Sequence, residues 1–242
     1  MVAIRGRAVS VFTMCVGVAL AGCSSPPSPS PTENTIAPSP QSAAATRKVD
    51  LSRLGEIRNA FPSGYPANTD SGPRIRDAQA SESVGDLVSY GEPLTVAPES
   101  CRALLKPVEA KASTDWASVT STTGPVDPFI ALSVYDPVSM PVALPTSGCD
   151  RFTFVVEGGG VPDGRAERLT APIFEGAVTY ALKVVFLVDN SSVEVPLVEY
   201  FYTAILDGRT FVNLWARVRS DFLAEPALPD LLKKAVAALR GQ

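Results

Sequence analysis

The stretch VEVPLVEYFYTAILDGRTFVNLWARV, residues 193–218, decides the fold of this chain. Two runs of alternating apolar residues flank the dipeptide Asp207-Gly208, and Asp-Gly between two such runs is the strongest short-range signal for a β-hairpin. A two-residue turn at this dipeptide places Leu206 opposite Arg209. The stretch therefore predicts two long antiparallel strands joined as a hairpin.

This register gives the hairpin one aliphatic face and one face that combines aromatic rings with polar groups. On the aliphatic face Phe201 pairs with Leu214. Aromatic rings that carry a polar group suit a surface that is partly buried and partly exposed to solvent. We predict that the second face lines a groove for a ligand or a partner; its residues are Tyr200, Tyr202, Phe211, Asn213 and Trp215. The alternative is that a helix, or the loop of residues 62–98, covers this face.

Further strands are expected upstream of the hairpin. Residues 129–135 and 151–157 are rich in β-forming side chains, and residues 178–188 place alternating apolar side chains on one face. Residues 110–120 fit either a helix or a strand. Residues 62–98, rich in Pro, Gly, Ser and Asp, are expected to form mostly a loop, which could hold a strand at 87–90.

Helical patterns lie at both ends of this region. Asp50 can cap a short helix, and Pro98 can start a second one. The last helix is expected from about Pro229, with one apolar stripe made of Leu228, Leu231, Leu232, Ala235, Val236 and Leu239. The fold class predicted from these elements is α+β: a central antiparallel meander packed on one face by the N-terminal and C-terminal helices.

The first 22 residues have the features of a secretory signal peptide. Two arginines precede an apolar stretch at residues 8–20, which is shorter than the ~20 residues that a membrane-spanning helix needs. The sequence Leu20, Ala21, Gly22, Cys23 that follows resembles the bacterial lipobox. This resemblance implies cleavage before Cys23 and attachment of diacylglycerol to its thiol. The alternative is a plain signal peptide with an incidental cysteine.

The next segment, residues 23–48, is rich in proline and serine and contains almost no large apolar side chains. Such a segment cannot form a core, so we expect a disordered tether. Residues 49–242 then form a single extracytoplasmic domain. Together these features predict a protein of the cell envelope, anchored by the lipid on Cys23 to the outer face of the cytoplasmic membrane.

Composition limits the functions that this domain can have. The chain has 21 basic and 25 acidic residues, a formal net charge of −4, so it lacks the basic surface typical of nucleic-acid binding. It contains no histidine, which removes Ser-His-Asp catalysis, histidine general bases and most transition-metal sites. We expect no metal and no cofactor.

Cys101 and Cys149 are the cysteines of the predicted domain. In an oxidising compartment such a pair is typical of a structural disulfide. A metal-binding pair or a redox pair is the alternative, but the wide spacing and the lack of a C-x-x-C motif disfavour both.

Three stretches resemble a family of uncharacterised mycobacterial-type lipoproteins: LSRLGEIRNAFPSGY at 51–65, the cysteine pair, and LPDLLKKAVAALRG at 228–241. More distantly, that family is similar to the extracytoplasmic sensor domain of a mycobacterial serine/threonine kinase. The resemblance covers residues 49–242 and implies an α+β fold with a groove for an unknown ligand. It implies no catalytic residues. The kinase sensor domain has two disulfides, whereas this domain can form only one.

These observations favour a membrane-anchored lipoprotein whose domain binds or senses a ligand without catalysis. The ligand is expected to be an apolar or amphipathic small molecule or a lipid. A second hypothesis is an accessory module that contacts another protein of the envelope. A third is a glycan-acting hydrolase that uses paired carboxylates, although no spacing in the sequence selects such a pair.

Overall fold

The computed structural model describes residues 48–75, 81–122, 128–158, 163–187 and 197–242. The predicted signal peptide (1–22), the lipobox with Cys23 and nearly all of the predicted tether (23–48) lie outside the described residues.

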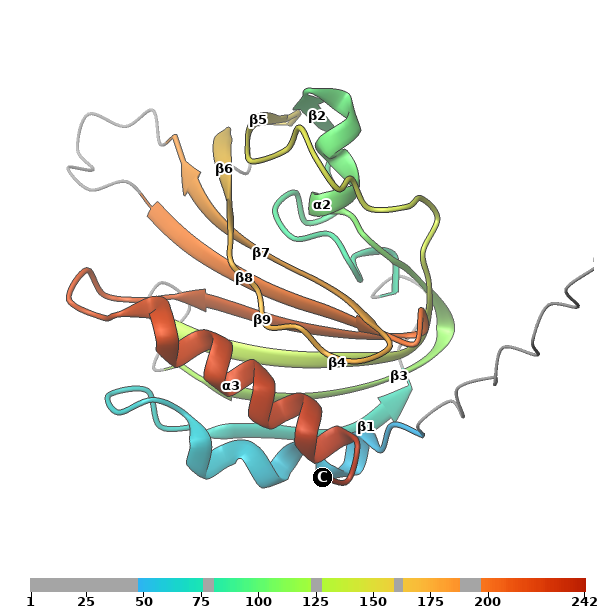
Figure 1. Cartoon of the computed structure of the whole chain (residues 1–242), viewed down its shortest axis with the longest axis vertical. Coiled ribbons are helices and arrows are strands. Elements are labelled where there is room, and N and C mark those ends of the chain that lie inside the picture. Colours follow the sequence, from blue (N-terminus) through green and yellow to red (C-terminus); the bar gives the residue numbers. More distant parts are fainter. Residues whose placement is uncertain (1–47, 76–80, 123–127, 159–162, 188–196) are drawn as a thin grey trace, which may run out of the picture. The chain divides into compact units, whose positions relative to one another are not determined.

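Within the described residues, nine strands form one antiparallel sheet in the order β1-β3-β4-β9-β8-β7-β6-β5-β2 (Figure 1). Strands β5 to β9 follow one another along the chain and across the sheet, so they form a meander, and β4 pairs with the outer side of β9. This arrangement confirms the predicted α+β fold around an antiparallel sheet. The strand bounds are β1 Thr69–Ile75, β2 Leu94–Ala97, β3 Glu109–Ser121, β4 Phe129–Ser139, β5 Arg151–Val156, β6 Gly164–Leu169, β7 Ala177–Phe186, β8 Leu197–Leu206 and β9 Thr210–Arg217.

The two edge strands lie in the region expected to be mostly loop. β1 contains Pro73 and a register shift between Ser71 and Arg74, and β2 is only four residues long. Short, irregular or proline-bearing strands are typical of sheet edges, where no further strand pairs. The strand considered at 87–90 is wrong, because those residues form bends and a turn. Residues 110–120 are strand, as part of β3.

Two helices cover one face of the sheet, as predicted. The N-terminal helix η1, Leu51–Ala60, is a 3-10 helix whose first turn is capped by Asp50, and the C-terminal helix α3 spans Ala224–Leu239. α3 begins before the expected start, so Pro229 lies inside it. The buried side of α3 packs with η1 and with buried residues of β3, β4, β8 and β9 in one hydrophobic cluster (Figure 1).

The opposite face carries a second hydrophobic cluster. Residues of segment 84–88 contribute to it together with the short helices η2, Glu99–Cys101, and α2, Arg102–Leu105. Cys101 and Cys149 form the predicted disulfide within this cluster, and both are fully buried. The bond ties the helical segment after β2 to the chain that enters β5.

The register of the central hairpin differs by one residue from the prediction. Leu206 pairs with Thr210, not with Arg209, and Phe201 pairs with Trp215. Contacts to β4 accompany this register. The guanidinium of Arg209 binds Asp136 with an Nε–Oδ1 distance of 3.0 Å, and the Arg209 carbonyl accepts a hydrogen bond from Val138. Arg209 is therefore held towards β4 and left out of the hairpin ladder.

Candidate functional site

The shift of register separates the residues predicted to line a groove. Because side chains alternate between the faces of a strand, a slip of one residue moves one strand's set to the other face. Tyr200 and Tyr202 lie on the side covered by α3. Phe211 and Trp215 pack with the second hydrophobic cluster on the opposite side, and Asn213, between them on the same strand, shares their face. The prediction of one shared aromatic face is therefore wrong.

The tyrosine side of the hairpin is closed. Tyr202 has no exposed surface, and its hydroxyl donates a hydrogen bond to Glu225 at the start of α3, with an O–O distance of 3.3 Å. Tyr200 is half-buried against the same cluster. The alternative weighed from the sequence, that a helix covers this surface, therefore holds for Tyr202.

The other side of the hairpin is an interlocked aromatic cluster. Trp215 stacks on Phe201 and meets Phe129 edge-on, with ring centroids 6.2 and 4.6 Å apart. Phe211 stacks on Tyr135, with centroids 6.0 Å apart.

A buried carboxylate lies beside this cluster. Glu199 is 1% exposed; it accepts the indole N–H of Trp215 at 2.6 Å and binds the guanidinium of Arg217 at 2.6 Å. Burial raises the pKa of the Glu199 carboxyl, while the hydrogen bonds from Arg217 and Trp215 counteract part of that rise. Both carboxylate oxygens of Glu199 are used in internal contacts, as is typical of a structural group.

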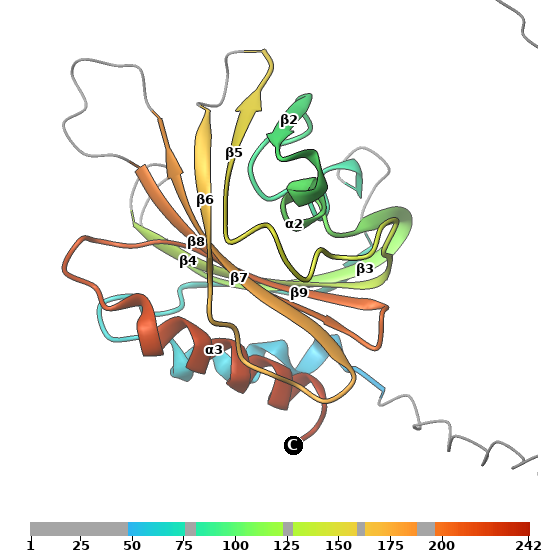
Figure 2. The same ribbon diagram turned by 45° about the horizontal axis from the view of Figure 1, so that its top comes forward.

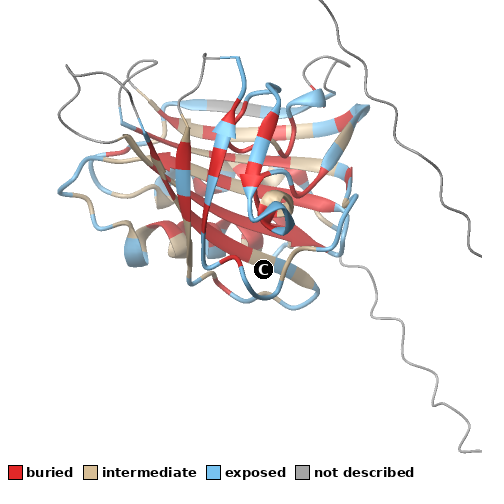
Figure 3. Cartoon of the chain, turned by 90° about the horizontal axis from the view of Figure 1, so that it is seen from above, coloured by how far each residue is buried: buried red, intermediate tan, exposed pale blue. Residues whose placement is uncertain are grey.

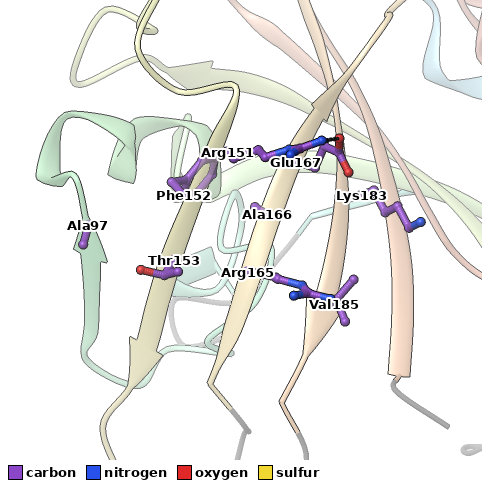
Figure 4. Close-up of a pocket in the computed structure, with 9 residues that line it drawn as sticks. All are labelled: Ala97, Arg151, Phe152, Thr153, Arg165, Ala166, Glu167, Lys183 and Val185. Atoms are coloured by element: carbon purple, nitrogen blue, oxygen red, sulfur yellow. Dashed lines mark hydrogen bonds and ion pairs between the residues drawn. The ribbon is translucent and has the colours of Figure 1, made fainter.

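An open pocket of about 530 Å³ lies instead on β5, β6 and β7 (Figure 4). Most of its side chains occupy alternate positions of these three strands and point to one face, because the period of a strand is two. These are Arg151 and Thr153 on β5, Arg165 and Glu167 on β6, and Lys183 and Val185 on β7. None of the residues predicted to line a groove belongs to this pocket. Its lining residues are Ala97, Arg151, Phe152, Thr153, Arg165, Ala166, Glu167, Lys183 and Val185.

The pocket is open because α3 stops short of it. The helix packs against η1, β8 and β9, while β5 and β6 diverge from it beyond β7 (Figure 2). Buried and exposed residues alternate strictly along β5, and such banding is visible on the strands in Figure 3. Arg151, Thr153 and Arg165 consequently face solvent, whereas Phe152 and Ala166 are buried in the second cluster.

The cross-strand register sets the positions of the charges in the pocket. Arg151, Glu167 and Lys183 form one row across β5, β6 and β7, and Thr153, Arg165 and Val185 form the next row. Arg165 is thus diagonal to both Arg151 and Lys183. Diagonal neighbours lie roughly 7–8 Å apart at Cβ, which is within reach of long side chains.

One of the three cations is already paired. Arg151 binds Glu167 with an Nη2–Oε1 distance of 2.9 Å, and this hydrogen bond, helped by the charges of Arg151, Lys183 and Arg165, lowers the pKa of the Glu167 carboxyl (Figure 4). Within the part of the chain that the structure describes, neither Arg165 nor Lys183 forms an ion pair. The pocket therefore holds two cations without a carboxylate partner.

Apolar side chains lie on the same face, next to the cations. Val185 belongs to the pocket, and Val155 and Leu187 occupy alternate positions further along β5 and after β7, with exposed fractions of 46% and 53%. Asp163 also lies in this outer row, where its Oδ1 accepts the backbone N–H of Val156. The face thus combines a cationic centre with an apolar margin.

The sequence contains a pattern of basic residues that indicates this site, but the pattern can be recognised only when the pairing of β5, β6 and β7 is known. Each of the segments 151–155, 164–168 and 181–186 has one basic residue at an outward position of the pocket face, but the middle segment was not predicted as a strand. Without β6, the side chains of Arg151, Arg165 and Lys183 could not be placed next to one another.

Two further observations concern the described residues alone. No group of three or more cysteine, aspartate and glutamate side chains among them has the geometry to hold a metal ion. No helix in that part of the chain combines the length and the apolar character needed to cross a membrane.

Comparisons with known proteins support the fold only. No protein-family model matches the chain, and no curated protein matches it. Among solved structures, the X-ray structure of an uncharacterised protein from Mycobacterium smegmatis, the Rv0999 ortholog, is similar, with a TM-score of 0.55 and 18% identity. The match covers 81% of this chain and 100% of that protein. The chain therefore has the fold of an uncharacterised mycobacterial protein.

Proposed function

We propose that this protein is a cell-envelope lipoprotein whose domain binds or senses an amphipathic ligand without catalysis. The observation that carries the proposal is the open pocket on β5–β7, which joins two unpaired cations to an apolar margin. Pockets that mix apolar surface with a few placed polar groups are typical of small-molecule sites. An amphiphile would place its polar group near Arg165 and Lys183 and its apolar part along Val185 and Leu187.

The location of the domain is part of the proposal and rests on the sequence. The apolar stretch at 8–20 and the motif Leu20, Ala21, Gly22, Cys23 support export and acylation of Cys23. The proline-rich segment 23–48 would then hold the domain away from the outer face of the cytoplasmic membrane. A domain in this position meets lipids and other envelope amphiphiles continuously.

The anchor is tested by the mass of the protein isolated from its own membrane. We expect a polypeptide that begins at Cys23 and carries the added mass of diacylglycerol. The variant Cys23→Ala should lack this mass and should partition into the aqueous phase. A full-length or unmodified mature chain would overturn the lipoprotein assignment.

Ligand binding is tested with octyl glucoside, a neutral amphiphile, kept below its micellar concentration and titrated by calorimetry. We expect saturable binding to the domain that is weakened by Val185→Gln. The matched control is Val178→Gln, because Val178 lies on the same strand outside the pocket and is 44% exposed. Thermal melting confirms that both variants are folded. Absence of binding, or equal weakening by both substitutions, would overturn the proposed site.

A further inference from the structure

The charged side chains of the pocket indicate the chemical class of its ligand more closely than the shape of the pocket does. Arg165 and Lys183 are diagonal neighbours on β6 and β7, and within the described residues neither forms an ion pair, although Glu167 lies opposite Lys183 and two residues from Arg165. Like charges at this distance repel each other, so a group that brings two negative charges between them removes an unfavourable interaction. The whole chain is acidic, with a formal net charge of −4, which makes this concentration of positive charge local.

The ion pair between Arg151 and Glu167 limits where a negatively charged group can bind in the pocket. Arg151 is held by Glu167 at 2.9 Å, and the Glu167 carboxylate would repel an anion placed beside it. An anion is therefore expected on the side away from Glu167. That side is the neighbouring cross-strand row, which holds Thr153, Arg165 and Val185. Thr153, directly opposite Arg165, adds a hydroxyl donor.

The two cations differ in what they offer a ligand. The guanidinium of Arg165 is a planar fork that can donate two parallel hydrogen bonds to oxygens of one group, whereas the ammonium of Lys183 acts as a point charge. A phosphate monoester has two charges and three free oxygens, which match this pair. A carboxylate or a sulfate monoester has a single charge and would leave one cation uncompensated.

We propose that the pocket binds the phosphate monoester group of a single amphiphile, between Arg165 and Lys183, with its chain on the apolar margin at Val185 and Leu187. This inference rests on the proposed function, since it assigns the head group of the ligand at the same site. The apolar margin favours a phosphorylated lipid over free phosphate as the source of the group.

The test uses alkyl ligands that share one chain and differ in the head group: octyl phosphate, octyl sulfate and octyl glucoside, each below its micellar concentration. Measurements at about pH 8 keep the phosphate doubly charged. We expect octyl phosphate to bind about tenfold more tightly than the other two, because one charge-assisted hydrogen-bonding contact contributes about this factor. Its affinity should fall as salt is added, since the pocket is open to solvent.

Three substitutions locate the head group. Arg165→Gln and Lys183→Gln should each weaken octyl phosphate about tenfold and leave octyl glucoside nearly unchanged. Glu167→Gln should strengthen octyl phosphate, because it removes a negative charge and frees Arg151. The matched controls are Arg102→Gln and Lys234→Gln, which remove the same charge outside the pocket and should change neither affinity.

The outcomes separate the two proposals. If octyl glucoside binds at Val185 but octyl phosphate binds no more tightly, the head-group inference is overturned and the amphiphile site stands. If inorganic phosphate binds as tightly as octyl phosphate, the site takes free phosphate and the lipid source is overturned. If none of the amphiphiles binds, both proposals are overturned.

Discussion

Trp215 donates its indole N–H to the carboxylate of Glu199 across the β8–β9 hairpin, with an N–O distance of 2.6 Å. The same carboxylate binds Arg217 at 2.6 Å and has only 1% of its surface exposed. A single buried acid therefore joins the two central strands on the face opposite α3. Its protonation should influence the stability of the whole sheet.

The first prediction concerns the pH dependence of this contact. Burial raises the pKa of folded Glu199 above its ordinary value of 4.5, so the folded protein holds the proton more tightly than the unfolded chain. Relative to Glu199→Gln, the wild type should be most stable below that ordinary value and should lose the advantage as the pH rises through the raised pKa. Urea unfolding of both proteins from about pH 4 to about pH 8 measures the difference. A difference that grows with pH would mean that Arg217 and Trp215 outweigh burial.

The second prediction concerns Gly164, which pairs with Phe154 across β5 and β6. A Cβ at Gly164 would overlap the ring of Phe154, which is buried and packed edge-on against Phe186. Gly164→Ala should therefore lower the free energy of unfolding by about 1–3 kcal/mol. Gly72→Ala is the control, because no atom lies within 4 Å of the added carbon. Adding Phe154→Leu to Gly164→Ala should recover part of the loss; a further loss would contradict the overlap.

The third prediction concerns the disulfide between Cys101 and Cys149, which are 48 residues apart. A cross-link over a long loop restricts the unfolded chain, and its removal typically costs about 2–4 kcal/mol. The double variant Cys101→Ala/Cys149→Ala should show this loss in urea unfolding. Adding a reductant should shift the unfolding midpoint of the wild type but leave the double variant unchanged. An unchanged wild-type midpoint under full reduction would contradict a stabilising role.

The fourth prediction concerns Tyr180, whose hydroxyl donates to the carbonyl of Leu104 at 2.9 Å within the second cluster. Tyr180→Phe removes this bond and leaves a buried carbonyl without its donor, so the free energy of unfolding should fall by about 1–2 kcal/mol. Tyr200→Phe on β8 is the control, since within the described part of the chain the Tyr200 hydroxyl makes no hydrogen bond. Equal effects of the two substitutions would contradict the specific role of the Leu104 contact.

The parts of the fold that could be predicted from the sequence are those with strong periodicity. Strands β5, β7, β8 and β9 alternate clearly, and α3 has a continuous apolar stripe. β1 could not be predicted because its sequence, TDSGPRI, contains Gly and Pro and lies at an irregular edge. β6 was missed because GRAERL directly follows a glycine-rich stretch and has little apolar alternation.

The candidate site depended on information that local sequence does not contain. In the observed register of the hairpin, Arg209 lies outside the ladder and binds Asp136 on β4, which is 73 residues away in the chain. A two-residue turn was the natural expectation for Asp207-Gly208 alone. A shift of one residue in the pairing of β8 with β9 places the residues of the predicted groove on two opposite faces of the sheet. The pocket at Arg165 exists because β6 lies between β5 and β7, and the sequence did not predict β6.

The hydrogen bond from the Asp50 N–H to the carbonyl of Leu239, at 2.9 Å, has a mechanical consequence. It fastens the point where the chain enters the fold to the last turn of α3. A pull on the chain ahead of Asp50 would therefore act on η1 and on the elements that pack against it, which are α3, β3 and β1. In the order of the sheet, β1 and β3 lie at the opposite end from β5, β6 and β7, which line the pocket.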